Sequence, residues 1–219
     1  MSDQSAPGAG ARQIWDISQK LGPGTPVWPG DLAVKSGTSW DHAPGSPVQV
    51  SWLRASTHAG THADAPLHYD PAGAAIDRVG LTPYLGPARV IDCAAARGEV
   101  TVAMLEAELK GAPPRVLIRT FARFPHRAWP VSFTAISPAA IALLAARGTL
   151  LIGTDAPSLD PENSKTMDAH LAVRDAGMGV LEGLVLDDVP PGDYELIALP
   201  LALEGLDAAP VRAVLRALA

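Results

Sequence analysis

The stretch from His58 to His68 restricts the possible folds of this chain more than any other part of its sequence. Eleven residues hold three of the six histidines and an aspartate, separated mostly by small residues: His58, His62, Asp64 and His68. A helix would align positions four apart, but Gly60 inside the stretch and Pro66 close behind disfavour a helix. In a straight strand, residues four apart lie roughly 13 Å from each other, too far to share a metal ion. We therefore predict that a strand ends here and bends at Gly60.

Such a bend would gather the imidazoles of His58 and His62 and the carboxylate of Asp64, and would leave coordination positions open. Zinc suits a set of this composition, and so do Mn²⁺ and Fe²⁺. An ion with open positions can lower the pKa of bound water towards about 7, so the set is typical of a catalytic site. His68 could bind metal or exchange protons beside it. We favour proton exchange, because an imidazole with a pKa of about 6.5 suits a general acid and base.

Length, charge and cysteine content limit the class of protein. The 219 residues, 47% of them hydrophobic, are enough for one globular domain, which we expect over residues 12–219 after a disordered tail at 1–11. The formal net charge of -6 disfavours a nucleic-acid partner. No run approaches the roughly 20 apolar residues of a membrane span, so no membrane partner is expected. The single cysteine, Cys93, excludes an intrachain disulfide and fits a cytoplasmic location.

Hydrophobic patterns along the chain alternate between strand and helix. Strands are predicted over residues 14–18, 48–57, 88–92, 115–120, 150–155 and 196–201, and helices over 102–109 and 139–147. Ser137 is the expected N-cap of the second helix, and Gly148 is expected to end it. Residues 211–216 fit a strand or a helix about equally. Because helices are few, we predict an α/β domain dominated by β-strands rather than a doubly wound sheet.

Residues 21–31 form a Pro- and Gly-rich N-terminal arm without regular structure. Trp28 lies in this arm between Pro26 and Pro29, so its indole would lose little entropy on binding a flat ligand. Packing of Trp28 against other residues is an equally good interpretation, because aromatic side chains mostly serve cores and interfaces.

A second group of polar residues lies more than a hundred residues after the first. His170 and Glu182 could ligate a second ion, with Asp64 bridging the two ions. Asp155, Asp160 and Asp168 are better explained as turn or capping residues.

Several separated motifs together resemble the cyclase-like metal-dependent hydrolases, and within them the bacterial kynurenine formamidases. The motifs extend from about residue 14 to 216: Trp15-Asp16-Ile17-Ser18, Pro26-Val27-Trp28-Pro29-Gly30-Asp31, His58-x-Gly60-Thr61-His62-x-Asp64-Ala65-Pro66-x-His68, Asp155-x-Pro157-Ser158-Leu159-Asp160, Lys165-Thr166-Met167-Asp168-Ala169-His170 and Leu181-Glu182-Gly183. The segment 121–133 departs from the family pattern, with Pro130 after Trp129 where an acidic residue is expected.

The resemblance implies a fold, a cofactor and roles for individual residues. It implies a swivelling β/β/α-type fold, a homodimer, and a strand at the C-terminus. It also implies two zinc ions per subunit, one held by His58, His62 and Asp64 and the other by Asp64, His170 and Glu182. In the same comparison His68 matches the proton donor and acceptor, and Trp28 matches a substrate contact.

The activity implied by the resemblance is hydrolysis of a small molecule, N-formyl-L-kynurenine, to L-kynurenine and formate in tryptophan degradation. A related hydrolase acting on another aryl amide such as isatin is a second hypothesis. A metal-stabilised binding module without turnover is a third. Open coordination positions beside a proton carrier are of no use to a purely structural site and favour the enzymes.

Overall fold

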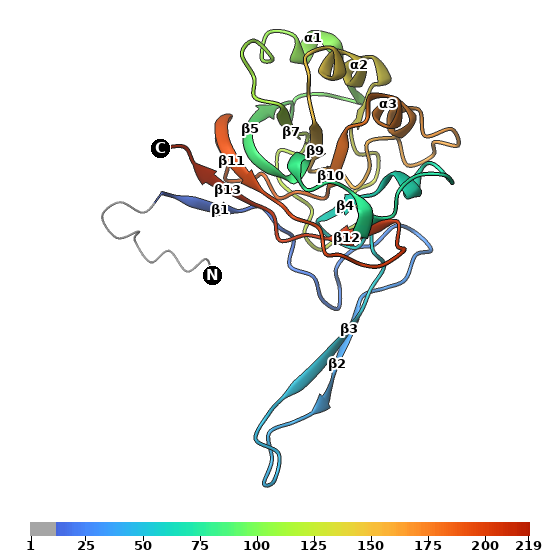
Figure 1. The fold of residues 1–219 in the computed structure, drawn as a ribbon, viewed down its shortest axis with the longest axis vertical. Helices are drawn as coiled ribbons and strands as arrows, with labels where there is room; N and C mark the ends of the chain where they lie inside the picture. The colour runs from blue at the N-terminus through green and yellow to red at the C-terminus, as the bar shows by residue number, and fades with distance from the viewer. Residues whose placement is uncertain (1–11) are drawn as a thin grey trace.

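A computed structural model describes residues 12–219 and has a nine-stranded mixed sheet at its centre (Figure 1). The tail expected at residues 1–11 lies outside this range. The strands follow one another across the sheet in this order: β1 (Ile14–Asp16), β13 (Val214–Ala217), β11 (Gly192–Ile197), β5 (Leu85–Asp92), β7 (Arg115–Arg119), β9 (Leu151–Thr154), β10 (Gly179–Glu182), β4 (His62–Asp64) and β12 (Ala208–Pro210).

The centre of the sheet is parallel and both of its flanks are antiparallel. β5, β7, β9 and β10 run parallel to their neighbours within this group, whereas β11 pairs antiparallel with β5 and β4 pairs antiparallel with β10. A further parallel pair, β6 (Glu99–Val100) with β8 (Ala135–Ile136), lies outside the large sheet. Short 3₁₀ turns, η1 (Pro66–His68), η2 (Ile76–Arg78) and η3 (Thr82–Tyr84), fill the connection from β4 to β5.

Alternating side chains of the central strands enter two different hydrophobic clusters. On β7, Val116 and Ile118 pack with the helical layer, while Leu117 between them faces the opposite cluster. The helical layer consists of α1 (Val102–Leu105), α2 (Pro138–Ala146) and α3 (Asp168–Ala176), which lie together on one side of the sheet in Figure 1. This period of two places apolar side chains on both faces, as expected for a sheet covered on both sides.

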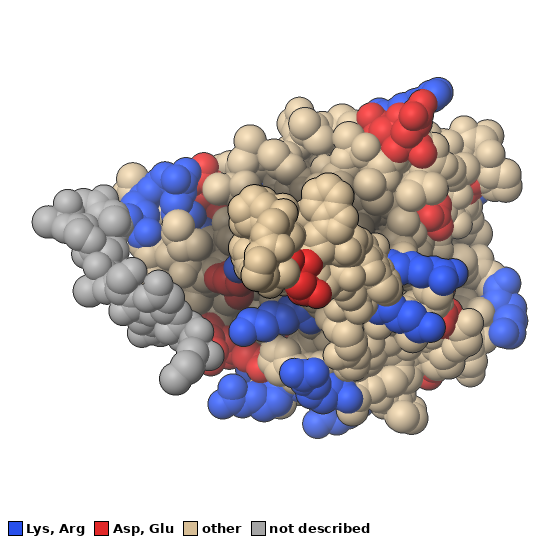
Figure 2. Space-filling view, turned by 90° about the horizontal axis from the view of Figure 1, so that it is seen from below, with Lys and Arg blue, Asp and Glu red and all other residues tan. Residues whose placement is uncertain are grey.

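The strands β2 (Lys35–Trp40) and β3 (Val50–Arg54) form a hairpin that projects away from the rest of the molecule (Figure 1). Trp52 packs across the hairpin over Gly37, where an added Cβ would lie only 2.6 Å from the indole. Large apolar side chains of the hairpin are nevertheless solvent-exposed, with Trp40 63% and Leu53 56% accessible. Seen end-on, the surface of the hairpin is mostly uncharged (Figure 2).

The predicted fold class is confirmed, and so is the C-terminal strand. Ser137 caps α2 as predicted, because its hydroxyl accepts a hydrogen bond from the Ala140 amide at 3.2 Å, and Gly148 follows the helix with a φ of +78°. Among the described residues, no helix has both the length and the apolar character that crossing a membrane requires.

Several predicted boundaries are wrong, three of them conspicuously. The helix expected over 102–109 ends at Leu105 and continues only as turns, although Leu109 is buried. The strand expected over 196–201 is instead 192–197, because pairing with β5 ends at Ile197 opposite Leu85. The strand expected over 48–57 ends at Arg54, and His58 lies in the turn that follows it.

Candidate metal centre

Pairing between β10 and β4 places the two separated polar motifs beside each other. Glu182 lies directly opposite His62 in this antiparallel register, and Asp64 lies opposite Val180. His62 and Asp64 are two residues apart on one strand and therefore point to the same face. The register thus brings Glu182, His62 and Asp64 onto one face of the sheet.

A close backbone approach brings β4 and β10 together at one end of this pair. Gly60 has a φ of +69° and Gly183 a φ of +63°, both in the left-handed region that favours glycine. A Cβ added at Gly183 would lie 2.6 Å from the Gly60 carbonyl oxygen. The Thr61 hydroxyl donates to the Gly183 carbonyl at 2.6 Å across the same contact. The bend predicted at Gly60 is therefore present.

Asp64 lies at the middle of the histidines. Its Oδ1 is 3.1 Å from His58 Nδ1 and 3.3 Å from His62 Nε2. Its Oδ2 is 3.3 Å from His170 Nε2, which comes from α3. The same His170 nitrogen is 3.3 Å from Glu182 Oε1. The other four residues expected to hold two ions thus lie around the Asp64 carboxylate.

The ligand atoms that lie close enough to one another to share an ion fall into two sets. One set is His58, Asp64 and His68, and the other is His62, Asp64 and Glu182. The grouping differs from the one implied by the family resemblance, because His68 joins a set and His170 lies outside both. Asp64 is the residue that the two sets have in common.

Each of the three histidines around Asp64 has a second oxygen partner on its other ring nitrogen. His62 Nδ1 lies 2.9 Å from the Gly60 carbonyl, His170 Nδ1 lies 2.6 Å from Asp160, and His58 Nε2 lies 3.0 Å from Asp207. Such outer oxygen partners fix the tautomer and the orientation of metal-binding imidazoles. The remaining nitrogens, Nδ1 of His58 and Nε2 of the other two, face the Asp64 carboxylate.

The charged groups of this cluster influence one another strongly. Burial disfavours protonation of His62, but the adjacent carboxylates of Asp64 and Glu182 outweigh burial and raise its pKa to about 10. Burial likewise opposes the charge on Asp64, yet the adjacent histidines hold its pKa well below the usual value. The pKa of His170 is raised, against burial, chiefly by its hydrogen bond to Asp160.

Hydrogen bonds within the protein do not satisfy all the polar atoms of this cluster. Among the residues described, His62 Nε2 and Asp64 Oδ1 are fully buried side-chain atoms without a hydrogen-bond partner. Leaving a buried polar atom unsatisfied costs about 1–3 kcal/mol, so such atoms are uncommon. Imidazole nitrogens and carboxylate oxygens are ligands that zinc and similar divalent ions accept. The residues present therefore fit a divalent metal ion.

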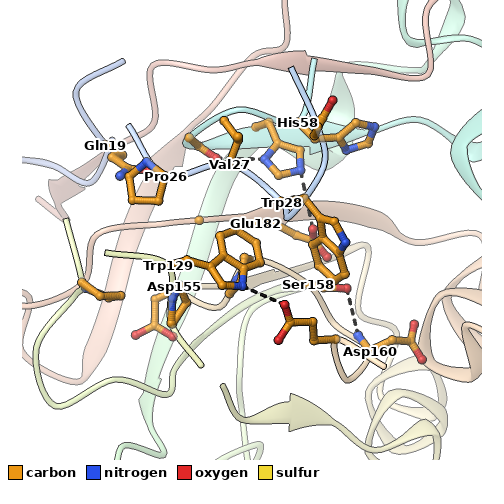
Figure 3. Close-up of a pocket in the computed structure, with 18 of the residues that line it drawn as sticks. Gln19, Pro26, Val27, Trp28, His58, Trp129, Asp155, Ser158, Asp160 and Glu182 are labelled. Carbon is orange, nitrogen blue, oxygen red and sulfur yellow. Dashed lines mark hydrogen bonds and ion pairs between the residues drawn. The ribbon is translucent and has the colours of Figure 1, made fainter. Parts of the chain in front are cut away.

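A pocket of about 340 Å³ opens above the cluster and is lined by His58, His62, His68 and Glu182. Trp28 and Trp129 lie together in its wall, with ring centroids 5.3 Å apart and planes at 74° (Figure 3). The Trp129 indole donates to Glu162 at 2.9 Å. Segment 121–133, which the sequence comparison expected to depart from the family pattern, supplies this part of the pocket wall.

Two of the three acidic residues interpreted as structural have contacts of that kind, and the third, Asp168, lies in the first turn of α3. Asp155 accepts hydrogen bonds from the amides of Thr120 and Phe121. Asp160 accepts hydrogen bonds from the amides of Ala169 and His170 at the start of α3, and its carboxylate also contacts the His170 ring. Asp160 therefore both caps the helix and orients its histidine, and the second role was not predicted.

Asp207 is a residue of the site that no sequence pattern predicts. It lies 149 residues from His58, after a stretch without regular structure, and no local spacing connects it to a histidine. Only the pairing of β12 with β4 brings Asp207 to the site.

Comparison with known proteins gives one family match and several similar structures. The sequence model of the Cyclase family matches residues 15–161. A solved structure described as a potential metal-dependent hydrolase with cyclase activity is 28% identical, with a TM-score of 0.82 over 95% of this chain and 100% of that chain. A predicted metal-dependent hydrolase from Bacillus stearothermophilus is 29% identical, with a TM-score of 0.79 over 94% and 99% of the two chains. Isatin hydrolase A from Labrenzia aggregata, solved with benzyl benzoate, is 26% identical, with a TM-score of 0.80 over 95% of each chain.

Proposed function

Because this chain belongs to the Cyclase family, whose fold it shares with metal-dependent hydrolases, we propose that it hydrolyses N-formyl-L-kynurenine to L-kynurenine and formate. The observation that carries the proposal is the position of the unsatisfied His62 and Asp64 atoms below a pocket with an aromatic wall. A site for a Lewis acid and a site for an aryl ring thus adjoin each other, as hydrolysis of an aryl formamide requires.

The metal ligands in this proposal are His58, His62 and Asp64 for one zinc ion, and Asp64, His170 and Glu182 for a second. Support comes from the short distances that join all five side chains around Asp64. Divalent ions bound there supply Lewis acidity, which polarises the formyl carbonyl and acidifies water. Mn²⁺ or another divalent ion could take the place of zinc.

His68 is the proton carrier of the proposed reaction. Its side chain lines the pocket, and its ring lies 4.2 Å from that of His58, measured between centroids. Water attacks the formyl carbon, a C–O bond forms, and His68 accepts the proton that the water loses. As the C–N bond breaks, His68 returns this proton to the aryl nitrogen, which leaves as the amine. The second product is formic acid, which ionises to formate by releasing its proton to water.

Trp28 contacts the aryl ring of the substrate in this arrangement. Its indole lies in the pocket wall beside Trp129, and the hydrogen bond from Trp129 to Glu162 holds the second indole in place. Edge-to-face and offset contacts with such a pair favour an aromatic substrate.

A specific feature of the pocket favours isatin as a second candidate substrate. None of the described residues that line the pocket is Lys or Arg, so a substrate carboxylate finds no cationic partner among them. N-formyl-L-kynurenine carries a carboxylate, whereas isatin carries none. The similarity to isatin hydrolase A from Labrenzia aggregata supports the same alternative.

One experiment separates the candidates. The purified protein is loaded with zinc, its metal content is measured, and release of kynurenine from N-formyl-L-kynurenine is followed beside ring opening of isatin. Rapid, metal-dependent kynurenine release is the expected result. Ring opening of isatin with negligible kynurenine release would transfer the activity to the second candidate. Bound metal without turnover of either compound would indicate a binding module.

The protein acts as a homodimer in this proposal, and the β2–β3 hairpin supports that interpretation. A two-stranded hairpin alone is marginally stable in water, and this one exposes Trp40, Trp52 and Leu53. A second copy presents the same apolar hairpin, so a two-fold arrangement would let each subunit bury the hairpin of the other.

A further inference from the structure

Asp207 is anchored beside the metal centre by the sheet. Ala208, the next residue, lies opposite Asp64 in the pairing of β12 with β4. The Asp207 carbonyl accepts a hydrogen bond from the Ala65 amide at 2.9 Å. The backbone of Asp207 is therefore fixed relative to the strand that carries His62 and Asp64.

The Asp207 carboxylate has a separate partner on each oxygen. Oδ1 accepts the Thr57 hydroxyl at 3.1 Å, and Oδ2 lies 3.0 Å from His58 Nε2. The same Oδ2 is 3.5 Å from His68 Nδ1. One carboxylate oxygen therefore faces Thr57, and the other is presented to two histidines.

His58 lies between two carboxylates, with Asp207 at Nε2 and Asp64 at Nδ1. A neutral imidazole has one N–H and one lone pair, and only the lone pair can bind a metal ion. If Nε2 donates its hydrogen to Asp207, the lone pair of Nδ1 faces Asp64. Without Asp207, the hydrogen can move to Nδ1 and bond to Asp64, which turns the lone pair away from the cluster.

We infer that Asp207 is a positioning residue, which holds His58 in the tautomer and ring orientation that direct Nδ1 towards a metal ion at Asp64. The inference rests on the proposed metal centre, and it assigns to Asp207 the role that Asp160 has for His170 on the other side of Asp64. The contact with His68 Nδ1 extends the effect, because it leaves His68 Nε2 as the nitrogen available for proton exchange.

Metal affinity tests this inference without any substrate. Zinc is titrated into the metal-free, full-length protein in competition with a chromophoric chelator, which gives the two binding constants. Loss of such outer partners weakens metal binding about 10- to 100-fold. We expect Asp207→Ala to weaken the binding of one of the two ions by this factor and to leave the affinity for the other ion unchanged. Asp207→Asn keeps a carbonyl oxygen for His58 and should restore part of the affinity.

Two further variants make the test specific. Asp160→Asn should weaken the binding of the ion whose affinity Asp207→Ala leaves unchanged, because Asp160 contacts His170 rather than His58. Thr57→Val removes the hydroxyl from the opposite oxygen of Asp207 but leaves the contact with His58. Zinc affinity should therefore remain within about threefold of the wild-type value, a smaller change than the loss of an outer partner causes. The Asp207 side chain is 41% exposed, so its removal should leave the metal-free protein folded, which circular dichroism checks.

The outcomes separate this inference from the proposed activity. Wild-type zinc affinities in Asp207→Ala would overturn the positioning role. An equal loss of affinity for both ions would also overturn it, and so would a loss of affinity for the same ion that Asp160→Asn affects. A full loss in Thr57→Val would also overturn it, because the contact with His58 remains in that variant. If the protein fails to release kynurenine but Asp207→Ala weakens one ion as expected, the substrate assignment fails and the role of Asp207 stands.

Discussion

Glu182 faces His62 across the pairing of β10 with β4, and its Oε2 lies 3.5 Å from His62 Nε2. This contact joins the two polar motifs, which are far apart in the sequence. It depends on the close approach of the backbone at Gly60 and Gly183.

Replacing Gly183 by Ala should therefore destabilise the protein and the metal centre together. The left-handed backbone alone costs a non-glycine residue about 1–2 kcal/mol. A Cβ 2.6 Å from the Gly60 carbonyl adds strain that forces the two strands apart. Thermal unfolding should show a fall in Tm of more than about 4 °C, given about 2–4 °C per kcal/mol for a domain of this size.

Gly111→Ala is the matched control for this prediction. Gly111 has a φ of +67°, similar to that of Gly183, but an added Cβ would meet nothing within 4 Å. The Tm of Gly111→Ala should fall only by the amount that the left-handed backbone costs, and its zinc affinity should remain that of the wild type. Equal effects of the two substitutions would contradict a role for the close approach.

Asp64→Ala should abolish binding of both ions. The Asp64 carboxylate contacts three histidines and belongs to both sets of ligand atoms that could share an ion. Elemental analysis after dialysis against zinc should find less than one ion per subunit. Retention of two ions would exclude Asp64 as the bridge.

His68→Ala should retain the metal and lose most of the turnover. General acid and base catalysis typically contributes about 10²- to 10⁴-fold, so kcat should fall by a factor in that range. Metal content is measured on the same preparation. Loss of an ion in this variant would instead make His68 a ligand, as the set with His58 and Asp64 allows.

Zinc affinity should rise with pH over the neutral range. The pKa of His62 is raised to about 10, so a proton occupies this imidazole below that pH and competes with the ion. Raising the pH removes the competitor, and the logarithm of the apparent binding constant should increase by about one per pH unit for each displaced proton. Calorimetry in buffers of different ionisation enthalpy measures the proton release. Binding that is independent of pH would show that His62 is not protonated in the metal-free protein.

Leu53→Asp should convert the proposed dimer to a monomer. Leu53 lies on the projecting hairpin and is 56% exposed. Leu81 is 55% exposed but lies outside the hairpin, so Leu81→Asp introduces the same charge at equal exposure and should leave the dimer intact. Sedimentation velocity distinguishes the mass of the monomer from that of the dimer. A dimer in both variants would place the interface elsewhere.

Local sequence patterns were informative where the residues concerned are neighbours in the chain. The bend at Gly60, the cap at Ser137 and the glycine after α2 were predicted because each depends on a few consecutive residues. Element boundaries were less accurate. The strand at Gly192–Ile197 extends as far as it pairs with residues 85–90 of β5, and local periodicity does not contain that limit.

The projecting hairpin shows a second limit of local patterns. Residues 48–57 alternate as a strand that packs on a core would, and the structure has a strand within them at Val50–Arg54. Every residue of that strand is exposed, because the hairpin leaves the body of the molecule. Alternation predicts the extended backbone, whereas the surroundings of each face depend on the rest of the fold.

The sequence by itself determined the β-dominated fold class, the bent stretch from His58 to His68 and, by resemblance, the family. The tertiary structure decided which distant side chains meet that stretch. The register of β10 against β4 brings Glu182 to His62, α3 directs His170 towards Asp64, and β12 brings Asp207 to His58. Two of these contacts form when strands pair across long separations in the chain, and a one-residue change in the register of β10 would turn Glu182 to the opposite face.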